Sequence, residues 1–198
     1  MNKETTQLSP TLSIRISTDG FCFCTYLPQQ PDSVKYSYHE CDEATSLSAN
    51  FAAAWEESGL AGRKYNNIQV IVSTTEFTTI PAEYDNSEEY ETIYGSCFPA
   101  SEKNVKILSN RLSAHNLTVL FTIDEELHES LCEIGEVTYY SPVSIIMGFL
   151  TRYPREEKRV LTAYLQGEKS LLIAMEEGRP LLMNGFASEE TQDQLYYL

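Results

Sequence analysis

Apolar and polar positions alternate in the same order in two separate stretches of the chain. The first stretch predicts strands over residues 12–16, 21–27 and 34–39, since alternation with a period of two is typical of half-buried strands. Asp19-Gly20 predicts the first hairpin turn, with a positive φ at both residues. Apolar residues at helical spacing then predict a helix over residues 46–55, capped by Thr45 or Asp42.

The second stretch repeats this order near the end of the chain. Strands are expected over residues 160–174, joined at Gln166-Gly167, and over residues 180–185 after a turn at 176–178. A helix is expected from Glu189 onward. The repeat predicts two units of three strands followed by a helix, which limits the fold more than any single residue does.

Between the repeats the pattern predicts alternating strands and helices. Strands are expected over residues 68–72, 105–108, 117–123 and 137–140, with an extended segment over 74–81. Helices are expected over 82–95, over 124–134 with Asp124 as its cap, and over 143–153 after Ser141 and Pro142.

The charged break at residues 154–158 is the expected domain boundary. This gives a polar tail over 1–10, a first domain over 11–154 and the start of a second, duplicated domain over 155–198. The last predicted helix stops within an apolar pattern, so the second domain is expected to be truncated.

Composition changes the expected function more than it changes the fold. The formal net charge is −15, with 29 acidic and 14 basic residues, which disfavours binding to nucleic acid. Neither a signal peptide nor an apolar run long enough to span a bilayer is present, which predicts a cytoplasmic protein without membrane insertion. The five cysteines do not suggest a disulfide framework, and Cys22 and Cys24 are expected to be buried rather than metal ligands.

The duplicated units, together with the long helix between them, resemble the actin-like ATPase superfamily. The segments 12–21, 79–81 and 184–197 are also similar to an uncharacterised bacterial family proposed to share this fold. The resemblance implies an α/β fold of mixed sheets in which each half is a ribonuclease-H-like unit and the second half is incomplete. It implies no assigned activity.

Active members of that superfamily bind ATP phosphates between the two hairpin turns and hold Mg²⁺ through aspartates of the first strands. Here the turns offer only Asp19, Gly20, Gln166 and Gly167, and the matching strand positions lack the paired acids. We therefore expect no catalytic residue, no cofactor and no metal. ATP with magnesium at those four residues belongs to the alternative, a nucleotide-binding ATPase or kinase-like enzyme.

The expected function is non-catalytic binding of another protein. The Tyr-rich segment 84–94 is interpreted as core packing or as an interaction surface. A third interpretation is self-association through an exposed edge strand of the incomplete second half. The sequence names neither the partner nor the biological role.

Overall fold

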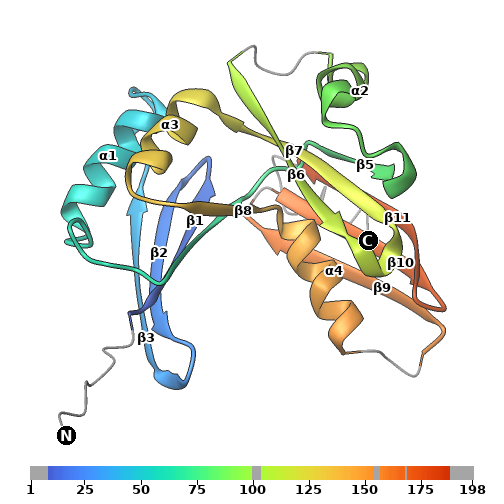
Figure 1. Cartoon of the computed structure of the whole chain (residues 1–198), viewed down its shortest axis with the longest axis horizontal. Helices are drawn as coiled ribbons and strands as arrows, with labels where there is room; N and C mark the ends of the chain where they lie inside the picture. The colour runs from blue at the N-terminus through green and yellow to red at the C-terminus, as the bar shows by residue number, and fades with distance from the viewer. Residues whose placement is uncertain (1–8, 100–103, 154–156, 168, 188–198) are drawn as a thin grey trace, which may run out of the picture. The chain divides into compact units, whose positions relative to one another are not determined.

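The two repeated stretches fall into different units of the fold (Figure 1). The computed structural model describes residues 9–99, 104–153, 157–167 and 169–187. Unit 1 comprises Met1–Val72 and Asp124–Tyr139, and unit 2 comprises Ser73–Ile123 and Tyr140–Leu198. The first repeat lies in unit 1, whereas the strands of the second repeat lie in unit 2.

Unit 1 is built on a five-stranded sheet with the order β3-β2-β1-β4-β8. Its strands are β1 (Thr11–Ser17), β2 (Gly20–Leu27), β3 (Gln30–Glu40), β4 (Asn67–Val72) and β8 (Val137–Tyr140). β1 and β3 pair antiparallel with β2, and β4 pairs parallel with β1. An antiparallel trio beside a parallel neighbour is the ribonuclease-H-like arrangement that the repeat predicts.

The helices α1 (Leu47–Glu57) and α3 (Glu125–Glu133) lie side by side in this unit (Figure 1). Alternation along β1 turns Leu12, Ile14 and Ile16 to one face, where all three are buried. Phe51 of α1 packs against this face, with its ring centroid 5.6 Å from that of Phe21. The amphipathic face of the helix and the alternating strand therefore form one core.

The cap of α3 is confirmed, whereas the cap expected for α1 is wrong. The Asp124 carboxylate accepts a hydrogen bond from the Leu127 amide at 2.8 Å. For α1 the cap is Ser46, not Thr45 or Asp42. Asp42 instead accepts from an amide two residues later, which forms a turn just before the helix.

The helix expected over residues 82–95 is wrong in its first half. That segment forms two 3₁₀ turns, Ala82–Tyr84 and Ser87–Glu89, and α2 begins only at Tyr90 and ends at Cys97. Between the turns the Asp85 carboxylate accepts hydrogen bonds from Tyr90, from Thr118 at 2.9 Å and from Arg111 at 3.1 Å. These distant partners hold Asp85 outside a helical conformation, so tertiary contacts override the local pattern.

Unit 2 contains two three-stranded sheets, ordered β5-β7-β6 and β11-β10-β9. Their strands are β5 (Phe77–Pro81), β6 (Val105–Leu112), β7 (Leu117–Asp124), β9 (Arg159–Gln166), β10 (Lys169–Glu176) and β11 (Arg179–Ala187). The strands of the second repeat are thereby confirmed, and the helix expected from Glu189 lies outside the described residues.

The helix α4 (Pro142–Arg152) begins as its sequence predicts. Ser141 accepts a hydrogen bond from the Ser144 amide, and Pro142 occupies the first turn. Val143, Met147 and Leu150 are buried on one side of the helix. No helix among the described residues is long and apolar enough to cross a membrane.

Candidate functional site

The first hairpin turn, which the sequence offers as a contact for nucleotide, is stabilised from within the fold. Ser17 pairs with Gly20 across the hairpin, so the central residues are Thr18 and Asp19. Neither they nor Gly20 has a positive φ, so the expected turn conformation is wrong. A Cβ at Gly20 would lie 2.3 Å from the His39 carbonyl oxygen. Gly20 therefore permits the close approach of β2 and β3.

The Asp19 side chain takes part in the same turn. The Tyr38 hydroxyl lies 2.8 Å from the Asp19 carbonyl oxygen and 3.3 Å from its carboxylate. The pKa of Asp19 is lowered from its ordinary value, chiefly because the Ser17 hydroxyl bonds to the carboxylate; this and smaller contributions outweigh the effect of burial. The Ser17 oxygen is also 3.2 Å from the Gly20 carbonyl. The ionised Asp19 carboxylate thus has a structural role in the turn.

The second hairpin turn is also tied to its own unit. The Gln166 side-chain oxygen accepts hydrogen bonds from the Tyr164 hydroxyl at 2.9 Å and the Ser73 hydroxyl at 3.2 Å. Gly167 has a φ of +54°, and a Cβ there would meet nothing within 4 Å. Glycine at this position therefore serves the left-handed backbone of the turn. Glu168, the next residue, lies outside the described part of the chain.

The four candidate nucleotide contacts form two pairs. Asp19 and Gly20 lie together in unit 1, whereas Gln166 and Gly167 lie together in unit 2. Each pair has the hydrogen bonds or the backbone conformation that a hairpin turn requires. A site that combines the two pairs stays a prediction.

The cysteines offer little support for metal or thiol chemistry. All five are free thiols, and within the described residues no three His, Cys, Asp or Glu side chains are grouped to hold a metal ion. Cys22 and Cys24 are half-buried on β2, so the burial expected for them is incomplete. Burial raises the pKa of the Cys24 and Cys41 thiols, which lowers the fraction of reactive thiolate.

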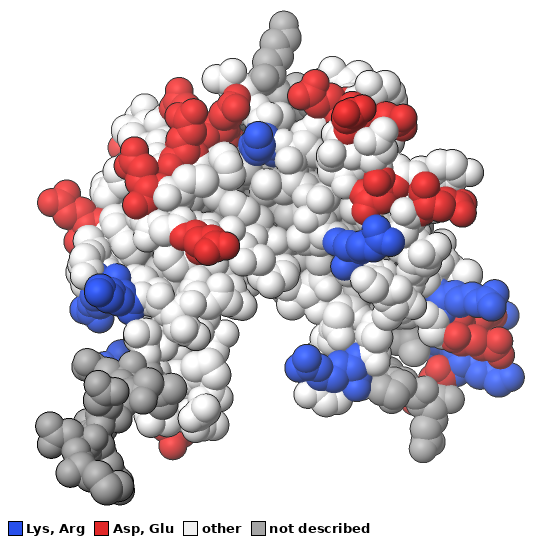
Figure 2. Space-filling view, viewed as in Figure 1, with Lys and Arg blue, Asp and Glu red and all other residues white. Residues whose placement is uncertain are grey.

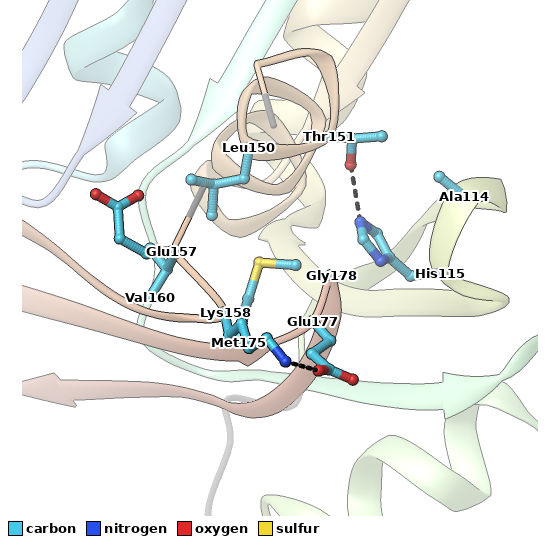
Figure 3. Close-up of a pocket in the computed structure, with 10 residues that line it drawn as sticks. All are labelled: Ala114, His115, Leu150, Thr151, Glu157, Lys158, Val160, Met175, Glu177 and Gly178. Carbon is cyan, nitrogen blue, oxygen red and sulfur yellow. Dashed lines mark hydrogen bonds and ion pairs between the residues drawn. The ribbon is translucent and has the colours of Figure 1, made fainter. Parts of the chain in front are cut away.

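A hollow with a volume of about 580 Å³ lies in unit 2 (Figure 3). It is formed by a 3₁₀ turn after β6, the end of α4, the segment before β9 and the turn between β10 and β11. Its lining residues are Ala114, His115, Leu150, Thr151, Glu157, Lys158, Val160, Met175, Glu177 and Gly178. Apolar walls with a few polar groups are typical of binding pockets.

Local backbone conformations place the walls of this pocket. Asn116 adopts a left-handed conformation, with a φ of 53°, and ends the 3₁₀ turn Ser113–His115. Across the pocket, Glu177 and Gly178 have φ values of 49° and 79° and form the two-residue turn between β10 and β11. Positive φ at both positions is the geometry that joins twisted antiparallel strands tightly.

The hydrogen bonds of His115 define its proton arrangement. The Thr151 hydroxyl donates to the Met147 carbonyl at 2.7 Å, and the same oxygen lies 2.8 Å from His115 Nε2. Thr151 has only one proton to donate, so Nε2–H of His115 must be the donor in their contact. In the neutral ring Nδ1 is therefore the acceptor nitrogen, which gives the pocket wall one oriented polar group (Figure 3).

The charges of the pocket lie at its rim. The Lys158 ammonium is 3.2 Å from the Glu177 carboxylate, and the backbones of these residues are also joined by a hydrogen bond. Both side chains are largely exposed, so this ion pair adds little stability. Glu157 has no ion-pair partner among the described residues, whose charged groups in this lining are two carboxylates and one ammonium.

Sequence reasoning did not find this pocket. The pattern predicts residues 176–178 only as a turn, and nothing in it distinguishes His115 as a functional residue. His115 and Thr151 are 36 positions apart, so their spacing gives no signal. The one feature of the sequence that points to this part of the chain is the cluster of basic residues over 152–159, which includes Lys158 of the pocket.

Comparison with known proteins supports the fold and assigns no activity. The family model described as "Protein of unknown function (DUF3822)" matches residues 2–198. No curated protein matches the chain. A Bacteroides thetaiotaomicron protein described as having an actin-like ATPase fold and unknown function is 27% identical, with a TM-score of 0.83. The match covers 100% of this chain and 77% of that one.

A more distant likeness extends over the same fold. A chain of the PilM–PilN type IV pilus biogenesis complex is 12% identical, with a TM-score of 0.52, over 95% of this chain and 66% of that one. At this identity the likeness concerns the fold alone. The actin-like architecture expected from the repeated strands is confirmed.

Proposed function

Since the chain belongs to the DUF3822 family of proteins of unknown function, we propose that it is a non-catalytic, cytoplasmic protein of the actin-like fold that acts by binding another protein. We propose a first domain over residues 11–154 and the start of its duplicate over 155–198. We also propose that the four candidate residues in the hairpin turns are structural. Their hydrogen bonds and backbone conformations support this assignment.

The observation that carries the proposal is the exposure of large apolar side chains in the second repeat. Leu161 is 58% exposed, Leu165 51% and Leu182 47%. The strand register places these three leucines on one face of the sheet: Leu161 and Leu182 both pair with Ala174, and Leu165 pairs with Ser170. Apolar side chains gathered on an exposed face are typical of protein interaction sites.

The outer side of α4 adds to this exposed apolar surface of unit 2. Ile145, Phe149 and Tyr153 follow one another at helical spacing and are each more than 40% exposed. The rings of Phe149 and Tyr153 are 4.9 Å apart, so they form one aromatic surface. Aromatic side chains of this kind are enriched among the residues that anchor protein partners.

The charge distribution supports a protein rather than a nucleic acid as the partner. Acidic residues gather over α1 and α3, where Figure 2 shows them exposed. They are Glu56, Glu57, Glu125, Glu126, Glu129 and Glu133. A surface of this sign repels the phosphate backbone of DNA or RNA.

The absence of nucleotide chemistry is tested by the melting temperature with ATP and Mg²⁺ at millimolar concentration. A ligand that binds only the native state must stabilise it, so binding of ATP would raise the melting temperature. We expect no binding and therefore no rise. A rise of several degrees that requires both ATP and Mg²⁺ would support the alternative, an ATPase or kinase-like enzyme acting through Asp19, Gly20, Gln166 and Gly167.

Binding through the second repeat is tested by quantitative affinity capture from the native cell extract. The bait proteins are the wild type, the double variant Leu161→Ser/Leu165→Ser, and the control Val34→Ser, which changes an apolar side chain of β3 that is 54% exposed. We expect at least one protein to be retained by the wild type and the control but lost by the double variant. Identical capture by all three proteins would contradict the proposal.

A further inference from the structure

One cysteine of unit 1 differs from the others because it lies beside a base. The Cys132 sulfur is 3.7 Å from Nε2 of His128, and no other cysteine among the described residues is hydrogen-bonded to a histidine. The two residues are four positions apart on α3, a spacing that brings side chains together on one face of a helix. Cys132 is also exposed. An accessible thiol within reach of an imidazole has the partners that an activated sulfur nucleophile requires.

The hydroxyl group of Tyr139, on β8, orients His128. It lies 3.0 Å from Nδ1, and the two rings pack with their centroids 5.3 Å apart. Burial and, after it, the neighbouring Cys132, to which the hydroxyl is hydrogen-bonded, raise the pKa of Tyr139. A hydrogen bond that favours the protonated phenol is one that the phenol donates. The Tyr139 oxygen then accepts Nδ1–H, and Nε2 of the neutral ring faces the thiol as the acceptor.

The position of this group is fixed by the core of unit 1. His128 and Cys132 each follow a fully buried leucine of α3, Leu127 and Leu131. Between them, the Ser130 hydroxyl is hydrogen-bonded at 2.9 Å to a serine of α1. The burial and the contact with α1 hold the helix in place, so the base is positioned beside the thiol before any reagent arrives.

Cys97 provides an internal reference for a thiol without a base. It is exposed, like Cys132, and ends α2 in unit 2. The nearest polar group to its sulfur in the structure is the Thr78 hydroxyl, at 3.6 Å. A threonine hydroxyl does not take up a proton at neutral pH, whereas a neutral imidazole does. The two exposed cysteines therefore differ in the presence of a base.

The surface around Cys132 is acidic. Figure 2 shows the acidic residues that gather over α1 and α3. Glu129, one helical turn before Cys132, and Glu133, next to it, are both exposed, and α3 contains no Lys or Arg. A field of this sign lowers the local concentration of anionic reagents and raises that of cationic ones.

We propose that Cys132 is a modification site, which forms mixed disulfides with small disulfide molecules that carry no net negative charge. His128 Nε2 takes the thiol proton as the Cys132 sulfur attacks one sulfur of the reagent. The new S–S bond forms, the S–S bond of the reagent breaks, and the departing thiolate takes the proton from Nε2. Cys132 is oxidised, and the reagent is reduced by the same two electrons. The site lies in unit 1, apart in sequence from the exposed leucines that carry the proposed function, so each is testable alone.

The proposal is tested by the reaction of the folded chain with cystamine, a disulfide with two positive charges. Mass spectrometry of peptides gives the rates at Cys132 and Cys97 in the same sample. We expect Cys132 to react about tenfold faster or more, as for catalysis by a positioned base. His128→Ala should remove most of this advantage, and added imidazole should restore part of it. His115→Ala is the control, since this histidine of unit 2 contacts neither cysteine, and should change neither rate.

The charge of the reagent tests the second part of the proposal. Cystamine should react faster than the anionic glutathione disulfide at Cys132, and the ratio of the two rates should fall by about twofold or more between low salt and about 1 M salt, because salt screens the field. Glu129→Gln/Glu133→Gln should lower the same ratio at low salt. A ratio that neither salt nor these substitutions change would overturn the selection by charge.

Two results would overturn the assignment of Cys132 itself. One is equal rates at Cys132 and Cys97 in the wild type. The other is a fast rate at Cys132 that His128→Ala leaves unchanged. Rescue by imidazole separates the loss of a base from a disturbed fold, since a disturbed helix would not regain its rate when imidazole is added.

Discussion

The two repeats have the same order of strands, but they bury their apolar residues differently. In the first repeat the apolar face of β1 and β2 packs against the helices of unit 1, and Leu12, Ile14 and Phe21 are fully buried. In the second repeat β10 is buried, whereas Leu161 and Leu165 on the adjacent strand remain more than half exposed. The face of β1 and β2 that the helices cover is therefore closed, although Val34 and Tyr36 of β3 in the same repeat are exposed, whereas the second repeat exposes apolar side chains of β9 and β11.

The hairpin turns of the two repeats also use glycine differently. The turn of the first repeat depends on contacts with β3, through the approach of Gly20 to His39 and the bond from Tyr38 to Asp19. The turn of the second repeat also has a tertiary contact, the hydrogen bond from Ser73 to Gln166, and in addition Gly167 has a positive φ with open space where a Cβ would lie. Glycine therefore permits a close approach of strands in the first turn and a left-handed backbone in the second, and the sequence pattern alone does not separate these two uses.

The largest expected effect is the difference in stability lost when a buried residue of β1 and an exposed residue of β9 are truncated. Ile14→Ala should lower the free energy of unfolding by about 2–5 kcal/mol, because it removes three carbons from a fully buried position. Leu165→Ala should lower it by less than about 1 kcal/mol, since its side chain is half in solvent. Urea denaturation measures both. Equal losses would mean that the exposed face is covered in solution.

The next largest effect concerns the two turns. Gly20→Ala should destabilise the chain by about 1–3 kcal/mol, because the new methyl group meets a backbone carbonyl that cannot move freely. Gly167→Ala should lower the free energy of unfolding by only about 1 kcal/mol, the amount expected for alanine at a left-handed φ with open space. Urea midpoints for the two variants check the order. A larger loss at Gly167 would reverse the interpretation of the turns.

The strands and several helix starts could be predicted from local sequence, because alternation and capping act over a few residues. Asp124 and Ser141 were found as caps for this reason. The start of α2 could not be found, since Asp85 is held by Arg111 and Thr118, which lie 26 and 33 positions away. The pocket of Figure 3 could not be found either, because His115 meets Thr151 only after the sheet and the helix have formed.

A smaller effect should depend on pH and report on the first turn. The pKa of Asp19 is lowered in the folded state, so its ionised carboxylate stabilises the native state at pH values above the pKa of an unfolded aspartate. Asp19→Asn should lower stability at pH 7 by no more than about 1 kcal/mol, because solvent screens this exposed carboxylate. The difference from wild type should vanish as the pH falls through the folded-state pKa.

Urea denaturation over a range from neutral pH to strongly acidic pH checks this expectation. Asp32→Asn, at an exposed position of β3, is the matched control for the loss of one carboxylate. A difference between wild type and Asp19→Asn that stays constant at all pH values would show that the carboxylate charge does not stabilise the turn.

The smallest expected effect is a gain in stability from replacing the glycines that occur in the helices of unit 2 but not in those of unit 1. α1 and α3 contain no glycine, whereas α2 and α4 each contain one, Gly95 and Gly148, with open space where a Cβ would lie. Alanine at either position should raise the free energy of unfolding by about 0.5–1 kcal/mol, since it restricts the unfolded chain and strains nothing. Urea denaturation measures both variants. A loss of stability at either position would mean that the added methyl group is not accommodated there.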